Sequence, residues 1–519
     1  MSNAVKATLG LALVTILSKF LGFGRELALT YVHGASAYSD AYITAVSIPL
    51  VLFSSIGTAI GTTFIPLFYE VSKSEGDRKS LDFTNNIINI VLLIGMLISI
   101  LGFKFAEPLV KIFAMNFSGE KLEVTVIFTK IMISGVMFIG ISQIMTSWLQ
   151  LNDKFIIPGM IGFPYNIIAI FSILLSSKGN INIMAIGTLI GTISQFLFQL
   201  PFAIKSNFRY KAYINLKDKH IKKMLWLIIP VFIGVGVNQL NNIVDRSLAS
   251  TLGDGIITIL NSANRLNNFV IGLFIATIAA VVYPTFSKLS NEGNKAKFIE
   301  SITQSINIVI ILIIPVSIGA IVLANPVVRI VFERGAFDSN ATSMTAIALA
   351  CYSIGMIGVG LREILNRVFF SLKDTRTPMI NGALSMIINI LLNIILIKFL
   401  GCAGLAFATS LASLICILLL FRSLNKKIGY YGQDKIIETI IKSLASAIIM
   451  SVFIIIIFKL VTNFLGIGFI KDIISLGAAT AIGAIVYIVL VIKLKVEEIN
   501  IITNRIKLKI CRCKESDVI

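Results

Sequence analysis

Long apolar runs, separated by short polar segments, recur along the whole chain. A helix that crosses a bilayer needs about 20 mostly apolar residues, and fourteen runs of that kind are present. They fall near residues 7–33, 38–70, 83–113, 122–150, 155–177, 182–204, 221–251, 256–287, 299–331, 341–370, 377–399, 402–423, 437–463 and 470–494. Several runs exceed the minimum, which predicts tilted or bent helices. The pattern therefore predicts an all-α, polytopic membrane protein with about 14 transmembrane helices.

The polar segments between the runs alternate in charge. Every second segment is rich in lysine and arginine, and the segments between them are short and carry roughly one cation or none. The richest lies between the sixth and seventh runs, where seven cations fall within residues 205–223. The positive-inside rule places these segments and both chain termini in the cytoplasm.

The chain also repeats itself at a constant spacing. Arg25 and Arg246 each begin an Arg-x-Leu-Ala stretch, and they are 221 residues apart. Asp153 and Asp374 each follow a long apolar run, and they are separated by the same distance. Two six-helix repeats are therefore predicted, and because six is even, both run the same way across the membrane, as in some transporters. The predicted parts are an N-lobe (1–215), a C-lobe (216–430), two extra helices (431–496) and a basic cytoplasmic tail (497–519).

The end of the chain has a pattern of its own. Residues 495–514 alternate apolar residues with lysine and arginine, which is typical of an interfacial amphipathic helix or of a simple basic tail. Cys511 and Cys513 lie in this segment, in a spacing that matches no disulfide framework or metal site. We expect both thiols to be reduced in the cytosol.

Composition supports a membrane protein and argues against two other classes. Hydrophobic residues make up 56% of the chain and charged residues only 14%, whereas soluble domains carry about 25% charged residues. The formal charge of +19 is spread over short loops, so nucleic acid is not expected as a partner. The two histidines lie near helix ends, and no catalytic triad or metal-ligand cluster is present. We expect a transporter without a cofactor, not an enzyme.

Charged residues inside apolar runs are the main functional candidates, because a charge in hydrocarbon is costly and usually faces a protein interior or a cavity. Lys19, Arg25 and Arg265 are such residues, and we predict that they line one cavity. Arg25 and Arg265 would both lie roughly 12–14 Å below the outer surface. Lys19 and Arg25 share a helix face only if the helix bends, which Gly22 and Gly24 would permit.

Further candidates lie beside these charges. Arg25 and Glu26 are sequence neighbours that point different ways on a helix, so each is expected to find another partner. Asp40 lies near the outer end of the second run, and Asp245 is a candidate ligand for a monovalent cation. The secondary candidates are Ser18, Glu26, Arg246 and Asn264.

Several stretches in this order resemble the MurJ (MviN) family of lipid II flippases. They are SKFLGFGRE, HGASAYSDAYITAVSIP, TTFIPLF, NSANRLNNF, VVYPTFSKLS, RIVFERGAFD and FFSLKDTRTP. The similarity covers most of the chain, including the two extra helices. The family belongs to the multidrug/oligosaccharidyl-lipid/polysaccharide exporter superfamily.

The resemblance implies a flippase of the bacterial cytoplasmic membrane. Its substrate would be the undecaprenyl-pyrophosphate-linked disaccharide-pentapeptide of peptidoglycan, moved from the inner to the outer leaflet by alternating access. The cationic cavity residues of the family map onto Lys19, Arg25 and Arg265, and an acidic one maps onto Asp40. Membrane lipids and cell-wall synthesis proteins would be its neighbours. The membrane potential or a monovalent cation would drive it.

One departure from the family keeps other substrates open. Family members often carry an arginine pair a few residues after the proline of the second helix, but here LVLFSS follows Pro49. A flippase for another polyprenyl-linked glycan is the nearest alternative, and a cation-coupled drug exporter of the same superfamily is the next. A drug exporter for cations predicts acidic cavity residues, whereas the candidates here are mainly basic. An intramembrane glycosyltransferase would need a large outer loop, and a structural scaffold would not need buried cations.

Overall fold

The computed structural model describes residues 3–466 and 468–498, and every regular element in these ranges is a helix. The described residues form two compact units, one extending to Thr258 and including Arg334–Ala341, the other formed by Ile259–Glu333 and the described residues from Thr342 onward. The first unit contains α1 (Asn3–His33), α2 (Ala37–Glu75), α3 (Asp77–Lys104), α4 (Ala106–Phe113), α5 (Gly119–Ile133), α6 (Val136–Leu151), α7 (Ile156–Met160), α8 (Gly162–Ser176), α9 (Asn182–Lys205), α10 (Lys219–Ala249) and the 3-10 turn η1 (Ser250–Leu252). The second contains most of α11 (Ile256–Asn291), α12 (Lys295–Val322), α13 (Ala324–Phe332), most of α14 (Ser339–Ile354), α15 (Met356–Ser371), α16 (Arg376–Ile428), α17 (Gln433–Leu465) and α18 (Phe469–Lys493).

Many of these helices are long and apolar enough to cross a membrane. Among the described residues, eight helices pass by length and composition, or ten when two bent pairs are each taken as one span. The predicted count of about 14 also treats α16 as two spans, which meet at Gly401 (φ 54°), and includes α1, α10 and α11. These last three helices have 31, 31 and 36 residues. The protein is therefore a polytopic helical membrane protein, as predicted.

Two of the predicted spans are broken in the middle. The axes of α5 and α6 differ by 41°, and those of α14 and α15 by 40°. The second break lies at Gly355, whose N–H donates to Ser410 Oγ at 3.0 Å, while the same hydroxyl donates to Cys351 O at 2.6 Å. A serine on α16 thus satisfies backbone groups that the break releases, which is required where water is excluded.

Two other predicted spans end earlier than expected. The span predicted at 83–113 ends at Lys104, and that at 299–331 ends at Val322. Each is followed by a short helix that buries one face at helical spacing, α4 through Val110 and Phe113, and α13 through Val328 and Phe332. The sequence pattern could not separate these short helices from the spans before them, because both are apolar.

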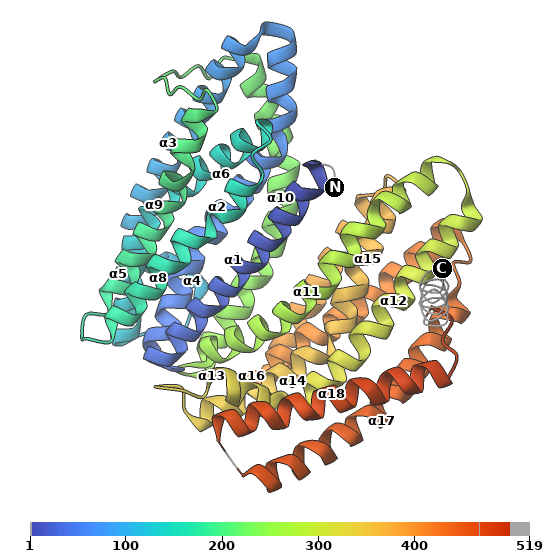
Figure 1. Cartoon of the computed structure of the whole chain (residues 1–519). Coiled ribbons are helices and arrows are strands. Elements are labelled where there is room, and N and C mark those ends of the chain that lie inside the picture. Colours follow the sequence, from blue (N-terminus) through green and yellow to red (C-terminus); the bar gives the residue numbers. More distant parts are fainter. Residues whose placement is uncertain (1–2, 467, 499–519) are drawn as a thin grey trace, which may run out of the picture. The chain divides into compact units, whose positions relative to one another are not determined.

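Within each unit, one helix contacts several others. In the first unit α2 packs against α3, α5, α6 and α10, and α1 packs along α8. In the second, α12 packs against α15 and α17, and α17 lies beside α18 (Figure 1). The first unit includes α10, which lies beyond the predicted lobe boundary at 215. The predicted boundary follows the sequence repeat, which the division into compact units does not test.

Candidate functional site

Arg25 lies on α1 against the face of an aromatic ring. Its guanidinium carbon is 5.2 Å from the centre of the Tyr165 ring on α8, within the range of a cation–π contact. One guanidinium nitrogen is 3.3 Å from Glu26 Oε1, and the two side chains are 13% and 7% exposed. The expectation that these neighbours point apart is therefore wrong. The long arginine side chain lies over Tyr165 and can still reach the adjacent carboxylate.

Lys19 occupies a different environment on the same helix. Its side chain is exposed, and among the described residues its ammonium has no ion pair or hydrogen bond. Ser18 beside it is half-buried where α1 approaches Gly162 of α8: a Cβ on that glycine would lie 2.1 Å from Ser18 Oγ. Gly22 and Gly24 also face α8, near Asn166 and Ile170. Gly162 therefore lets α1 and α8 approach closely, whereas a Cβ at Gly22 or Gly24 would make an ordinary contact at 3.8 Å. The helix α1 itself continues unbroken from Asn3 to His33.

Asp40 is enclosed at the first turn of α2, where it is 0% exposed. Its Oδ1 accepts from the N–H of Thr258 at 2.8 Å and from the Thr258 hydroxyl at 2.7 Å. Its Oδ2 accepts from the N–H of Gly255 at 2.8 Å and from the Lys121 ammonium at 2.9 Å. Gly255 and Thr258 flank the start of α11, so this carboxylate caps the amino end of that helix. The prediction that Asp40 contacts substrate stays a prediction, but its visible contacts are structural.

The turn before α11 depends on close backbone packing. Gly255 has φ +81°, and a Cβ there would lie 2.4 Å from the carbonyl oxygen of Ala35. A side chain at this position would therefore clash with backbone as well as strain the turn. Lys121, on α5, completes the arrangement by also binding Asp254 at 2.8 Å. Lys121 could not be predicted as a partner for Asp40, because the two are 81 residues apart.

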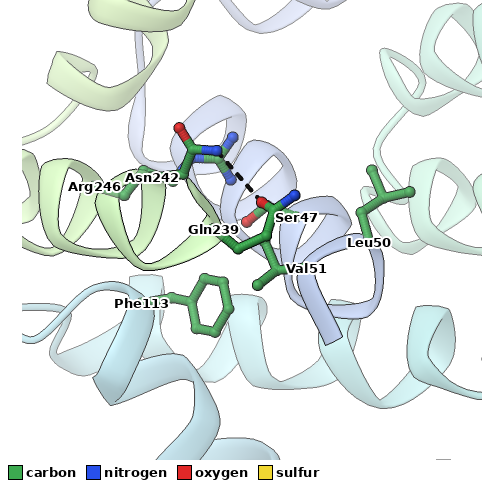
Figure 2. A pocket seen from close by; sticks show the side chains of 7 residues that line it. All are labelled: Ser47, Leu50, Val51, Phe113, Gln239, Asn242 and Arg246. Carbon is green, nitrogen blue, oxygen red and sulfur yellow. Dashed lines mark hydrogen bonds between the residues drawn. The ribbon is translucent and has the colours of Figure 1, made fainter. Parts of the chain in front are cut away.

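A cavity of about 240 Å³ lies between α2, α4 and α10 in the first unit (Figure 2). Its lining residues are Ser47, Leu50, Val51, Phe113, Gln239, Asn242 and Arg246. Arg246 donates to the carbonyl oxygen of Ile43 at 3.3 Å, and Asn242 donates to Gln239 at 3.3 Å (Figure 2). Sequence reasoning named Arg246 but missed the two amides, although NQLNN at 238–242 is a polar interruption of an apolar run. Asp245, predicted as a cation ligand, is half-buried and accepts from Asn241 at 3.2 Å.

Arg265 belongs to the second unit. It is exposed on α11, and the neighbouring Asn264 is half-buried and accepts a hydrogen bond from Asn268. Lys19 and Arg25 lie in the first unit. The convergence of these three cations on one headgroup therefore stays a prediction.

Bent and continuous membrane-spanning helices with cations inside apolar stretches make this chain a polytopic helical membrane protein. The fold is similar to an inward-facing multidrug resistance MATE family transporter of the MOP superfamily, with a TM-score of 0.65 over 80% of this chain and 94% of that one. At 14% identity this likeness concerns the fold alone.

The assignment of this chain to a family rests on matches of higher sequence identity. The family model for the lipid II flippase MurJ matches residues 29–489, and the chain belongs to that family. The probable lipid II flippase MurJ of Buchnera aphidicola is 30% identical over 86% of this chain and 88% of its own. That of Vibrio cholerae is 29% identical over 83% and 85%. A solved structure of MurJ in an inward closed conformation is 28% identical, with a TM-score of 0.80 over 92% of this chain and 97% of that one.

Proposed function

We propose that this protein moves lipid II from the inner to the outer leaflet of the bacterial cytoplasmic membrane. The observation that carries the proposal is the family match over residues 29–489, most of the chain. Relatives that match over more than four-fifths of their own length are named as lipid II flippases. The likeness to the drug transporter is one of fold only and gives no support to drug export.

The physical problem is to carry a pyrophosphate and its sugars through hydrocarbon. Transfer of an unpaired charge from water to hydrocarbon costs on the order of 20 kcal/mol in the idealised limit. Lys19 offers an exposed ammonium, and Arg25 offers a planar set of donors held on Tyr165. We assign these two residues and Arg265 to the pyrophosphate, because charge-assisted hydrogen bonds to phosphate oxygens lower the barrier.

Asp40 is assigned a positioning role. Its carboxylate receives four hydrogen bonds and is fully buried. It holds the first turn of α11, the helix that carries Arg265. Movement of substrate between leaflets by alternating access requires the packing at this end of the helices to change. Asp40 and Lys121 then act on that step, and a direct contact of Asp40 with the headgroup stays a prediction.

Orientation and energy coupling form the last part of the proposal. The basic loops place both termini in the cytoplasm by the positive-inside rule. A cationic cavity is drawn toward the cytoplasm by an inside-negative potential, at about 2.3 kcal/mol per charge per 100 mV. The potential therefore favours return of the empty transporter, and a monovalent cation near Asp245 is the second candidate driver.

Complementation tests the function. A bacterial strain depleted of its own lipid II flippase should regain growth when it expresses this protein. The same strain expressing an unrelated membrane protein should not regain growth. Failure to restore growth, with the protein present in the membrane at the level of a functional relative, would contradict the proposal.

A further inference from the structure

A second polar cavity lies in the second unit, between α12, α17 and the residues that follow α18, with a volume of about 280 Å³. Eight of its nine lining residues are polar or charged, Val496 being the exception. A cavity of this composition is not suited to an acyl or polyprenyl chain. It lies outside all the candidate sites described above.

Two buried acceptor atoms in this cavity have no hydrogen-bond donor among the described residues. Asn307 and Glu498 are 1% and 6% exposed. Asn307 Nδ2 donates to Glu498 Oε1 at 2.5 Å. Asn307 Oδ1 and Glu498 Oε2 then have no hydrogen-bond partner within the described part of the chain. A buried carboxylate oxygen without a donor is unfavourable, so the pair is suited to a ligand that brings positive charge and N–H groups.

An exposed cation also lines this cavity. Lys435 is 2.8 Å from Glu497 and Lys442 is 2.5 Å from Glu438, so both are paired. Lys495 is exposed, and its ammonium makes no ion pair or hydrogen bond with any residue that the structure describes. The cavity thus offers both buried acceptors and an available ammonium, which together complement a zwitterion.

The cavity lies at a polar–apolar boundary of α17. Lys435, Glu438 and Lys442 line it, and no charged residue follows Lys442 until Lys459. In a membrane helix such a boundary marks the level of the lipid headgroups. A ligand in this cavity is therefore within reach of the bilayer.

We propose that this cavity binds the headgroup of a phospholipid that carries a primary ammonium and a phosphate, as in phosphatidylethanolamine. The ammonium donates to Glu498 Oε2 and Asn307 Oδ1, and the phosphate accepts from Lys495. A bare metal ion would fill only a small part of about 280 Å³. A quaternary ammonium, as in phosphatidylcholine, has no N–H to donate to the two acceptors.

The first test uses the full-length wild-type protein, purified and delipidated in a nonionic detergent. Short-chain phosphatidylethanolamine, its N-methyl and N,N-dimethyl forms and phosphatidylcholine are titrated against the thermal unfolding midpoint. We expect the apparent affinity to fall stepwise as methyl groups replace N–H, with phosphatidylcholine at least tenfold weaker. Equal affinity for the two end members overturns the proposal.

Two further arms identify the source of the ligand. Soluble phosphoethanolamine should stabilise the protein at least tenfold less well than the lipid, and equal binding would contradict a membrane ligand. Sodium or potassium chloride should stabilise no more than choline chloride without lipid. If either metal ion stabilises the protein and Glu498→Gln abolishes that effect, the ligand of the cavity is an ion and the lipid proposal is wrong.

Variants test the assigned contacts. Glu498→Gln and Asn307→Leu should each weaken phosphatidylethanolamine binding at least tenfold, and Lys495→Gln should weaken it for both lipids. Glu292→Gln, an exposed carboxylate in another loop, is the control and should leave binding unchanged. Unchanged preference for phosphatidylethanolamine in folded Glu498→Gln protein would show that the acceptors do not select the headgroup.

Discussion

The guanidinium of Arg25 is held between the face of Tyr165 and the carboxylate of Glu26. Stacking on a ring suits a planar guanidinium better than a compact ammonium. The remaining donors of Arg25 are therefore fixed in direction before any substrate arrives. Such preorganisation favours phosphate binding, because little side-chain freedom is lost on contact.

Arg25→Ala should slow lipid II flipping roughly ten- to a hundredfold, because one charge-assisted contact is worth about 1.5–3 kcal/mol. Arg25→Lys should restore activity only in part. Growth of the depleted strain at limiting expression, with membrane levels measured in parallel, checks both. Lys111→Ala serves as control, since that lysine forms an exposed pair with Glu107 on α4. Wild-type growth of Arg25→Ala would show that the residue is structural.

The Asp40–Lys121 pair should contribute more to stability than the Lys121–Asp254 pair. Asp40 is buried, and removing one member of a buried ion pair costs about 3–5 kcal/mol. Asp254 is 68% exposed, and such pairs contribute about 0–1 kcal/mol. Thermal unfolding in detergent should therefore show a large fall in midpoint for Asp40→Ala and a small one for Asp254→Ala. Equal shifts for the two variants would refute the capping role.

Some of these residues were readable from the sequence and others were not. Arg25 and Lys19 stand out because each is a charge inside an apolar run. The groups that contact Asp40 and Arg25 could not be predicted. Thr258 lies 218 residues from Asp40, and Tyr165 is an ordinary aromatic residue in a membrane helix. A single sequence records which side chains are costly to bury but not which distant groups compensate for the burial.

At the scale of elements, α3 holds the connection between α9 and α10. Asn86 exchanges two hydrogen bonds with the backbone of Asn215, at 2.9 and 2.8 Å. Asn85 accepts from the N–H of Lys211 at 3.1 Å, and Asn89 donates to the carbonyl oxygen of the same residue at 3.0 Å. Three buried asparagines on α3 therefore hydrogen-bond the backbone of segment 209–215, which has no regular secondary structure.

Asn86→Leu should release this segment. The change leaves two backbone groups without partners, at a cost of about 1–3 kcal/mol. Limited trypsin digestion of the purified protein should then cleave faster after the exposed Arg209 and Lys211. Asn291→Leu, at the exposed last residue of α11, is the control. Identical digestion of Asn86→Leu and wild-type protein would mean that the asparagines do not order the segment.

Element types followed from the sequence better than element ends. Long apolar runs predicted the helices, yet the breaks before α6 and α15 and the short helices α4 and α13 were missed. The break before α15, for example, is accompanied by the contact that the distant Ser410 makes with the backbone at Gly355. The interruption NNIIN at 85–89 lies inside an apolar run and gave no hint of the loop it holds.

At the scale of the whole molecule, orientation can be measured directly. In a variant with its five native cysteines replaced by serine, single cysteines at Ala212 and Tyr430 should react only with a reagent in the cytoplasm. Single cysteines at Asn180 and Asp338 should react only with a reagent outside. All four positions are exposed, so access to the side chain does not limit the reaction. Labelling of Ala212→Cys from outside would contradict the alternation of basic loops.

Two turns at nearly the spacing of the predicted repeat share a backbone conformation. Asp153 and Lys373 both have positive φ, 57° and 58°, in the turns after α6 and α15, and they are 220 residues apart. This spacing is one residue short of the 221 read from the sequence, and the organisation into two six-helix repeats stays a prediction. The grouping of α10 with the first unit could not be predicted from the sequence, because it depends on how α2 and α10 pack.

The central claim is that this protein carries lipid II across a bilayer, and flipping in reconstituted vesicles tests it most directly. Purified protein is placed in vesicles whose inner leaflet contains fluorescent lipid II, and its arrival outside is followed with a membrane-impermeant quencher while an inside-negative or an opposite potential is imposed. We predict potential-dependent transfer of lipid II by the wild-type protein and much slower transfer by Arg25→Ala. Transfer no faster than in protein-free vesicles under either potential, from protein shown to be folded, would contradict the account.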